Sequence, residues 1–388
     1  MTPRRRDLLV VFAAALAARL LFVAFDGRGE AERVGDALDY HSYAVNLLDR
    51  GVYENHQDER ASRMPGYPLL LAAQYATLGR SPALTQVLQA LLGAGTCVLV
   101  YLLAAAFSGG ALPLAAGLAA ALSYDLVQPA ARLLTEGPAA FLLALTLWLL
   151  SEDRGLRPGR AALAGAAAGG LCLVRPEFLP WSALMAGLAG WRSRWVNGAL
   201  LLAVSAACVL PWAARNARTL GRPIAATSVG AFNLYGWGVP RTVEERLGGP
   251  AWERAPAELS EVEKSDFYAA RTKRFFLMEG AYGLVLKALL LNLAFLHYPF
   301  SPALDPTFVF LLPLWLYGLW AARRDGRRRA LWWTVAYLTP LYCLAGVMIP
   351  RHRETYAPVL VVFAAAGFEA LSARFGAAAA RRAAAGWG

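Results

Sequence analysis

Cysteine and histidine are both scarce in this chain of 388 residues, which contains four of each. No Cys-x-x-Cys pair and no Cys/His spacing suited to a metal occurs in it. The cysteines all fall inside apolar stretches; they are Cys97, Cys172, Cys208 and Cys343. This pattern excludes a disulfide framework and gives no support to a zinc site. We therefore expect no bound metal and no cofactor.

Charged residues are also few, at 17% of the chain, whereas 57% of the residues are hydrophobic and the mean hydropathy is +0.40. A soluble globular domain averages about 45–50% apolar residues. The apolar stretches are mostly about 18–22 residues long, which is the length that a helix needs to cross a bilayer. The sequence therefore predicts an all-α, polytopic membrane protein.

The net charge of +11 comes mainly from arginine, in short runs between the apolar segments. These runs are Arg4 to Arg6, Arg154 to Arg160, Arg192 with Arg194, Arg323 to Arg329, and Arg381 with Arg382. A nucleic-acid-binding protein would instead gather such charge on one soluble face, so we expect no nucleic-acid partner. The runs follow the positive-inside rule and predict that both termini lie in the cytoplasm.

Hydropathy and charge together predict about ten crossings. The expected spans are 8–25, 85–107, 111–128, 137–151, 161–175, 178–191, 195–213, 306–322, 330–349 and 355–372. Segments 66–80 and 282–300 are apolar but suit helices lying at the interface. The polar segments 26–65 and 214–281 both fall outside. The chain then divides into a module over 1–213 with a first outer loop over 26–84, an outer region over 214–305, and C-terminal helices with a basic tail over 306–388.

The first outer segment places two carboxylates, Asp36 and Asp39, at the start of a short amphipathic helix that Gly51 should end. Its apolar face is formed by residues at helical spacing, namely Tyr40, Tyr43, Ala44, Leu47 and Leu48. A structural alternative fits the same pattern: Asp36 could cap the helix, with Asp39 completing a capping box.

Further charged residues follow at the expected outer ends of spans. They are Arg63, Glu136, Arg175, Arg215, Arg351 and Arg353. Arginine on the outside runs against the positive-inside rule, and its guanidinium matches phosphate oxygens. An acid beside a short span is costly if it is buried, and it is therefore a candidate for function. The alternative is that these side chains are interfacial anchors, and Arg63 would then extend along the headgroups.

Taken in order, these segments resemble the bacterial branch of the dolichyl-phosphate-mannose protein mannosyltransferase family, whose GT-C-fold members are related to the aminoarabinose transferase that modifies lipid A. The resemblance rests on Gly35 to Tyr40, Arg63 to Pro68, Thr135-Glu136, Arg175 to Glu177, and Pro211 to Asn216. It covers residues 8–240, and the last third matches by hydropathy alone. Met64 departs from the pattern, because many relatives have a proline there.

The resemblance implies a multi-pass GT-C glycosyltransferase of the bacterial inner membrane, with juxtamembrane helices in its first outer loop. It implies an inverting transfer at the outer face, from a polyprenyl-phosphate-linked sugar to a lipid, glycan or protein acceptor. Asp36 matches the catalytic aspartate of the family, with Asp39 as the second candidate. The candidate substrate-binding residues are Tyr40, Arg63, Glu136, Arg175, Arg215, Arg351 and Arg353.

The chemistry agrees with these residue types, because a carboxylate can take the proton of an attacking hydroxyl while arginines stabilise a leaving phosphate. Three alternatives stay open. A transporter or flippase of lipid-linked substrates is disfavoured by the few acids in the spans and by the lack of paired, interrupted half-helices. A polymerase or ligase would use a lipid diphosphate donor. An assembly subunit would have no catalysis at all.

Overall fold

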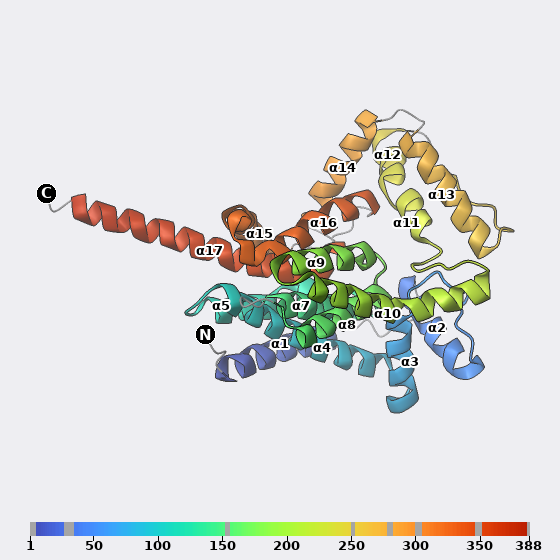
Figure 1. Cartoon of the computed structure of the whole chain (residues 1–388), viewed down its shortest axis with the longest axis horizontal. Helices are drawn as coiled ribbons and strands as arrows, with labels where there is room; N and C mark the ends of the chain where they lie inside the picture. Colours follow the sequence, from blue (N-terminus) through green and yellow to red (C-terminus); the bar gives the residue numbers. More distant parts are fainter. Residues whose placement is uncertain are drawn as a thin grey trace.

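The computed structural model describes residues 5–26, 35–151, 156–249, 253–277, 282–298, 305–345 and 351–385. Within these ranges every regular element is a helix (Figure 1). The all-α prediction is therefore confirmed for this part of the chain.

Four of the described helices are long and apolar enough to cross a membrane. They are α1 (Arg5–Asp26), α4 (Pro82–Phe107), α10 (Trp195–Leu220) and α17 (Arg351–Ala385), the last over Arg351–Phe375. A fifth span results if α13 (Glu261–Leu277) and α14 (Tyr282–Leu296) are counted as one bent pair. The count of about ten crossings stays a prediction.

Shorter helices occupy the other expected spans. They are α5 (Leu112–Leu122), α7 (Glu136–Leu150), α8 (Pro158–Val174), α9 (Phe178–Arg192), α15 (Pro306–Ala321) and α16 (Arg329–Ala345). The span expected over 111–128 is interrupted, because Ser123 is extended and separates α5 from α6 (Tyr124–Val127) and the 3-10 turn η2 (Gln128–Ala131). An 11-residue helix such as α5 is only about 17 Å long, against a hydrocarbon core of about 30 Å.

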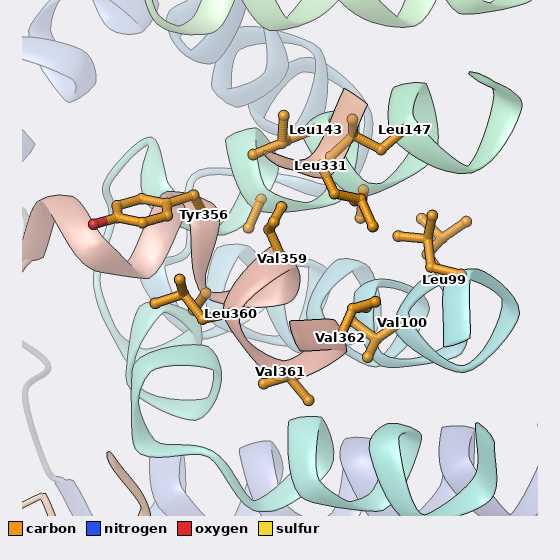
Figure 2. Close-up of a cluster of buried hydrophobic side chains, with 14 of the residues drawn as sticks. Leu99, Val100, Leu143, Leu147, Leu331, Tyr356, Val359, Leu360, Val361 and Val362 are labelled. Carbon is orange, nitrogen blue, oxygen red and sulfur yellow. The ribbon is translucent and has the colours of Figure 1, made fainter. Parts of the chain in front are cut away.

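The core lies where α17 packs between α4, α7 and α16 (Figure 2). The side chains drawn there include Leu99 and Val100 of α4, Leu143 and Leu147 of α7, Leu331 of α16, and Val359 to Val362 of α17. All of them are buried. Their branched and aliphatic shapes fill the space between the helices without polar atoms that would need partners.

Glycine lets two of these helices meet backbone to backbone. A Cβ on Gly318 of α15 would collide with the carbonyl oxygen of Phe363 in α17, and one on Gly367 would collide with that of Leu314. Small residues at such contacts let helices approach closely in the membrane, where association depends on van der Waals packing. The close contact with α15 therefore fixes the path of α17, in addition to its core contacts with α4, α7 and α16.

The helices of the first outer loop and of the polar segment 214–281 gather at one end of the bundle (Figure 1). They are α2 (Asp36–Arg50), α3 (Gly66–Leu78), α11 (Gly230–Gly236), α12 (Val239–Leu247) and α13. The start of α1 and the far part of α17 lie at the opposite end (Figure 1). The two polar segments singled out in the sequence therefore share one end of the bundle (Figure 1).

Candidate functional site

The helix that presents the two aspartates is α2, and glycine bounds it on both sides. Gly51 adopts a left-handed φ of 67° and donates its N–H to the carbonyl of Leu47, which confirms the expected stop. At the start, the capping position belongs to Gly35, with φ 60° and no side-chain cap. The alternative in which Asp36 caps the helix is therefore wrong, since Asp36 is already the first helical residue. Its carboxylate is free for other partners.

The Asp36 carboxylate lies between two arginines that come from distant parts of the chain. Its Oδ1 accepts a hydrogen bond from Nη2 of Arg63 at 2.6 Å, and its Oδ2 accepts one from Nη2 of Arg351 at 2.7 Å. Burial raises the pKa of Asp36, but the attraction of Arg63 and Arg351 outweighs it and leaves the pKa below its usual value. Asp36 is therefore ionised at neutral pH.

Asp39, one turn further along α2, orients Arg63. Its Oδ2 accepts from Nε of Arg63 at 3.0 Å and from Nη2 at 2.7 Å. The other oxygen accepts from Nδ2 of Asn55 at 3.2 Å and lies 3.3 Å from Nδ1 of His56. The Arg63 guanidinium also lies over the ring of Tyr40, 5.7 Å from its centroid. Asp39 is thus a positioning residue for Arg63 in this geometry.

Arg351, the second arginine bound to Asp36, also contacts a buried group of charged side chains. Its Nε lies 2.8 Å from Oε1 of Glu136, the first residue of α7, and Nη1 of Arg175 donates to the same oxygen at 3.2 Å. Nε of Arg175 donates to Oε1 of Glu177 at 2.6 Å. Only 1% of Glu136 is exposed, and its second oxygen has no hydrogen-bond partner within the described structure. Such a group needs its arginines, because a lone buried carboxylate is costly.

These contacts form one row of alternating acids and arginines, which we call the charged row. In order it consists of Asp39, Arg63, Asp36, Arg351, Glu136, Arg175 and Glu177. Exposure is concentrated in the middle, where the side chains of Arg63, Asp36 and Arg351 are 24–29% exposed. Further along the row, Glu136 and Arg175 are only 1% and 9% exposed, and the terminal Glu177 is 18% exposed. A ligand can therefore reach the row at Asp36 and its two arginines.

Arg215 was expected at the same site, but the structure places it on other partners. Its Nη1 and Nη2 donate to the carbonyl oxygens of Arg60 and Tyr53 at 2.6 and 2.9 Å. The guanidinium lies over the rings of Tyr53 and Trp212. The sequence predicted a span ending at residue 213, whereas α10 continues to Leu220 and presents Arg215 from a helix. Arg215 holds the first outer loop on α10.

Arg353 was expected beside Arg351 but turns into the bundle. Nε and Nη2 of Arg353 donate to the two oxygens of Asp125 at 2.7 and 2.8 Å. Nη2 also lies 3.5 Å from Oδ2 of Asp305, and the guanidinium sits 3.5 Å from the ring centroid of Phe308. Residues two apart on a helix do not face the same way, and α17 begins at Arg351, before the predicted 355. With 2% of its side chain exposed, Arg353 is a structural cation in this geometry.

Several groups that touch the charged row had no role in the sequence analysis. They are Asn55, His56, Tyr337, Tyr342 and His352. Tyr342 donates to Oε1 of Glu177 at 3.2 Å, and the His352 ring stacks on the Tyr342 ring with centroids 4.9 Å apart. His352 was visible between two noted arginines. Tyr342 had no local signal, because its contact joins α16 to the loop before α9.

Metal ligation is the remaining chemical option for these acids. No group of three or more His, Cys, Asp or Glu side chains close enough to hold a metal ion occurs in the ranges the structure describes. Each acid of the charged row is instead paired with arginine. The arrangement suits recognition of an anion and transfer of a proton.

Neither the family models nor the curated proteins give a match to this chain. Solved structures do. One is the archaeal oligosaccharyltransferase AglB from Archaeoglobus fulgidus, in complex with an inhibitory peptide and a dolichol-phosphate. The match covers 98% of this chain and 51% of the AglB chain, with 15% sequence identity and a TM-score of 0.56. The oligosaccharyltransferase of that organism in complex with Zn and sulfate matches 95% of this chain over 49% of its own, with 16% identity and a TM-score of 0.57. The form tethered to an acceptor peptide with the NVT sequon gives the same four values.

This chain has the GT-C fold. It spans about half the length of the structures it matches. Together with the apolar helices, the fold makes it a multi-pass membrane protein. The charged row joins the start of α2 and the loop before α3 to the starts of α7 and α17 and to the turn between α8 and α9.

Proposed function

We propose that this protein is an inverting glycosyltransferase that moves a sugar from a polyprenyl-phosphate carrier to an acceptor hydroxyl at the outer face of the bacterial inner membrane. The observation that carries the proposal is the position of Asp36, which is ionised, partly exposed and held between Arg63 and Arg351. A base and two cations that match phosphate thus meet at one accessible point.

The reaction follows from these groups. The Asp36 carboxylate takes the proton of the acceptor hydroxyl as its oxygen forms a bond to the anomeric carbon. The bond from that carbon to the phosphate oxygen breaks, and the phosphate leaves with the electron pair. Because attack and departure occur on opposite faces of the sugar, the anomeric configuration inverts.

The leaving group explains why one catalytic carboxylate is enough. A phosphate monoester has a second pKa of about 6, so it departs without a general acid when cations stabilise its charge. Arg63 and Arg351 would supply that stabilisation, and Asp39 and Glu136 would hold them in place. Soluble glycosidases, in contrast, use two carboxylates.

The comparisons support this class of chemistry, because the matched proteins are oligosaccharyltransferases, one of them solved with a dolichol-phosphate and another with a tethered acceptor peptide. We extend the proposal to the bacterial branch of the dolichyl-phosphate-mannose protein mannosyltransferase family, on the residues that resemble it. The acceptor is then a lipid, a glycan or a protein.

Native mass spectrometry of the protein purified in mild detergent tests the donor. We expect a co-purified polyprenyl monophosphate in the wild type, and its loss in the double variant Arg63→Ala/Arg351→Ala. Arg80→Ala is the matched control, since Arg80 pairs with Asp49 on the surface near the same outer loop and is 43% exposed. A lipid diphosphate in its place would keep the enzyme class and change the donor. Bulk phospholipid alone in all three samples would refute the donor assignment.

A further inference from the structure

Asp36 occupies the one point at which Arg63 and Arg351 converge. One Nη2 from each arginine reaches a different oxygen of the same carboxylate, at 2.6 and 2.7 Å. A phosphate presents two neighbouring oxygens in a similar way, and guanidinium groups bind carboxylate and phosphate with the same donor geometry. The position suited to the donor phosphate is therefore filled by a side chain.

Each of the two arginines also contacts a second carboxylate, which the other does not touch. Arg63 is held by Asp39 through Nε and Nη2, and Arg351 is held by Glu136 through Nε. Both guanidinium groups would thus keep their places if Asp36 moved away. Asp36 is the only acid in the charged row that lies between two partly exposed arginines.

We propose that Asp36 is a stand-in for the donor phosphate in the free protein, and that donor binding displaces it from both arginines and releases it as the base. This inference rests on the proposed function. It adds an order of events: the carboxylate is held by the arginines until the donor arrives, and only then becomes available to the acceptor hydroxyl.

The electrostatics of Asp36 agree with this order. In the free protein its pKa is lowered by Arg63 and Arg351 against the effect of burial. When a phosphate takes the arginines, burial and the new negative charge both raise the pKa of the released carboxylate. A higher pKa makes the released carboxylate a stronger base, so donor binding would itself activate Asp36 for proton transfer.

Binding of an unreactive probe tests displacement without any turnover. A short-chain isoprenyl methyl phosphodiester carries the single negative charge of the donor and has no sugar to transfer. Displacement requires that Asp36→Asn bind this probe more tightly than the wild type, by about fivefold, because the competing anion is gone. Asp39→Asn removes the same charge beside the same arginine, and should bind the probe more weakly because Arg63 loses its orientation.

Proton uptake in the wild type gives a second, independent readout. Calorimetric titration with the probe near pH 5, in buffers of different ionisation enthalpy, should show uptake of a proton that Asp36→Asn lacks. The diester does not titrate there, so the proton belongs to the protein. The uptake itself is measured in the wild type, so its detection does not depend on how well the variants fold.

Three results are distinguishable. Tighter binding in Asp36→Asn but not in Asp39→Asn, with proton uptake in the wild type, supports displacement. Binding that weakens or stays equal in Asp36→Asn, without proton uptake in the wild type, overturns displacement and leaves the donor class intact. No binding of the probe to any of the proteins overturns both displacement and the proposed donor.

Discussion

Replacing Arg351 by lysine tests whether both of its contacts are needed. The guanidinium uses Nη2 for Asp36 at 2.7 Å and Nε for Glu136 at 2.8 Å. A lysine ammonium is a compact point charge on a flexible stem, and it cannot reproduce this two-sided geometry. We expect one of the two contacts to be lost in Arg351→Lys while the positive charge is kept.

Because the donor phosphate takes the place of Asp36 on Arg351, the lysine loses either its contact with that phosphate or the contact with Glu136 that orients it. The magnitude follows from that single lost contact. A hydrogen bond to a charged group contributes about 1.5–3 kcal/mol, which corresponds to a decrease of roughly 10- to 150-fold in kcat/KM for the donor. The assay measures release of labelled sugar from the carrier that mass spectrometry identifies. Arg80→Lys is the control, since Arg80 also contacts one carboxylate through two nitrogens but lies on the surface. Activity of Arg351→Lys within about twofold of the wild type would refute the role assigned to Arg351.

Three further changes probe the site and the fold. The pKa of Asp36 is lowered in the folded state, so its pairing with arginine stabilises the protein at pH values above the usual aspartate pKa of 3.8. This stabilisation is lost as the pH falls from 3.8 through the lower pKa of the folded state. A melting-temperature difference between wild type and Asp36→Asn that already disappears near pH 5 would contradict this. Arg353→Met leaves the buried carboxylate of Asp125 without its arginine and should destabilise the fold by about 3–5 kcal/mol. Thermal unfolding in detergent measures this effect, and an unchanged melting temperature would show that the ion pair does not stabilise the fold. Gly318→Ala should lower the melting temperature, because the new Cβ would collide with the backbone of α17. Gly187→Ala is the control and should leave the melting temperature unchanged, because the space at its Cβ is open. Equal effects of the two substitutions would argue against close contact of α15 and α17.

Local patterns were enough to predict α2 and its end, because the apolar spacing lies within the helix and Gly51 directly follows it. Gly51 ends the helix where the sequence predicted, since glycine alone adopts the left-handed conformation at little cost. Its two carboxylates were also placed correctly in the first turn. What the pattern could not decide was whether Asp36 caps the helix or serves another partner. That depended on Arg63 and Arg351, which contact it across long separations.

The arginines show the same limit. Arg351 and Arg353 had equal claims in the sequence, and only the early start of α17 turns one toward Asp36 and the other toward Asp125. Arg215 was assigned to a loop because hydropathy ends near residue 213, although α10 continues to Leu220. Hydropathy marks the apolar part of a helix, and it gives no signal where a helix extends beyond that part.

The charged row joins segments from both ends of the chain. Asp36 and Arg63 belong to the part that resembles the mannosyltransferase family, whereas Arg351 comes from the last third, where no motif was found. A fragment covering residues 8–240 would contain every segment of the resemblance and still have an incomplete anion site. If the chain were cut in the 214–305 region and its two pieces made separately, neither piece alone would hold the complete anion site, and the proposed transfer would require both pieces to reassociate in one bilayer.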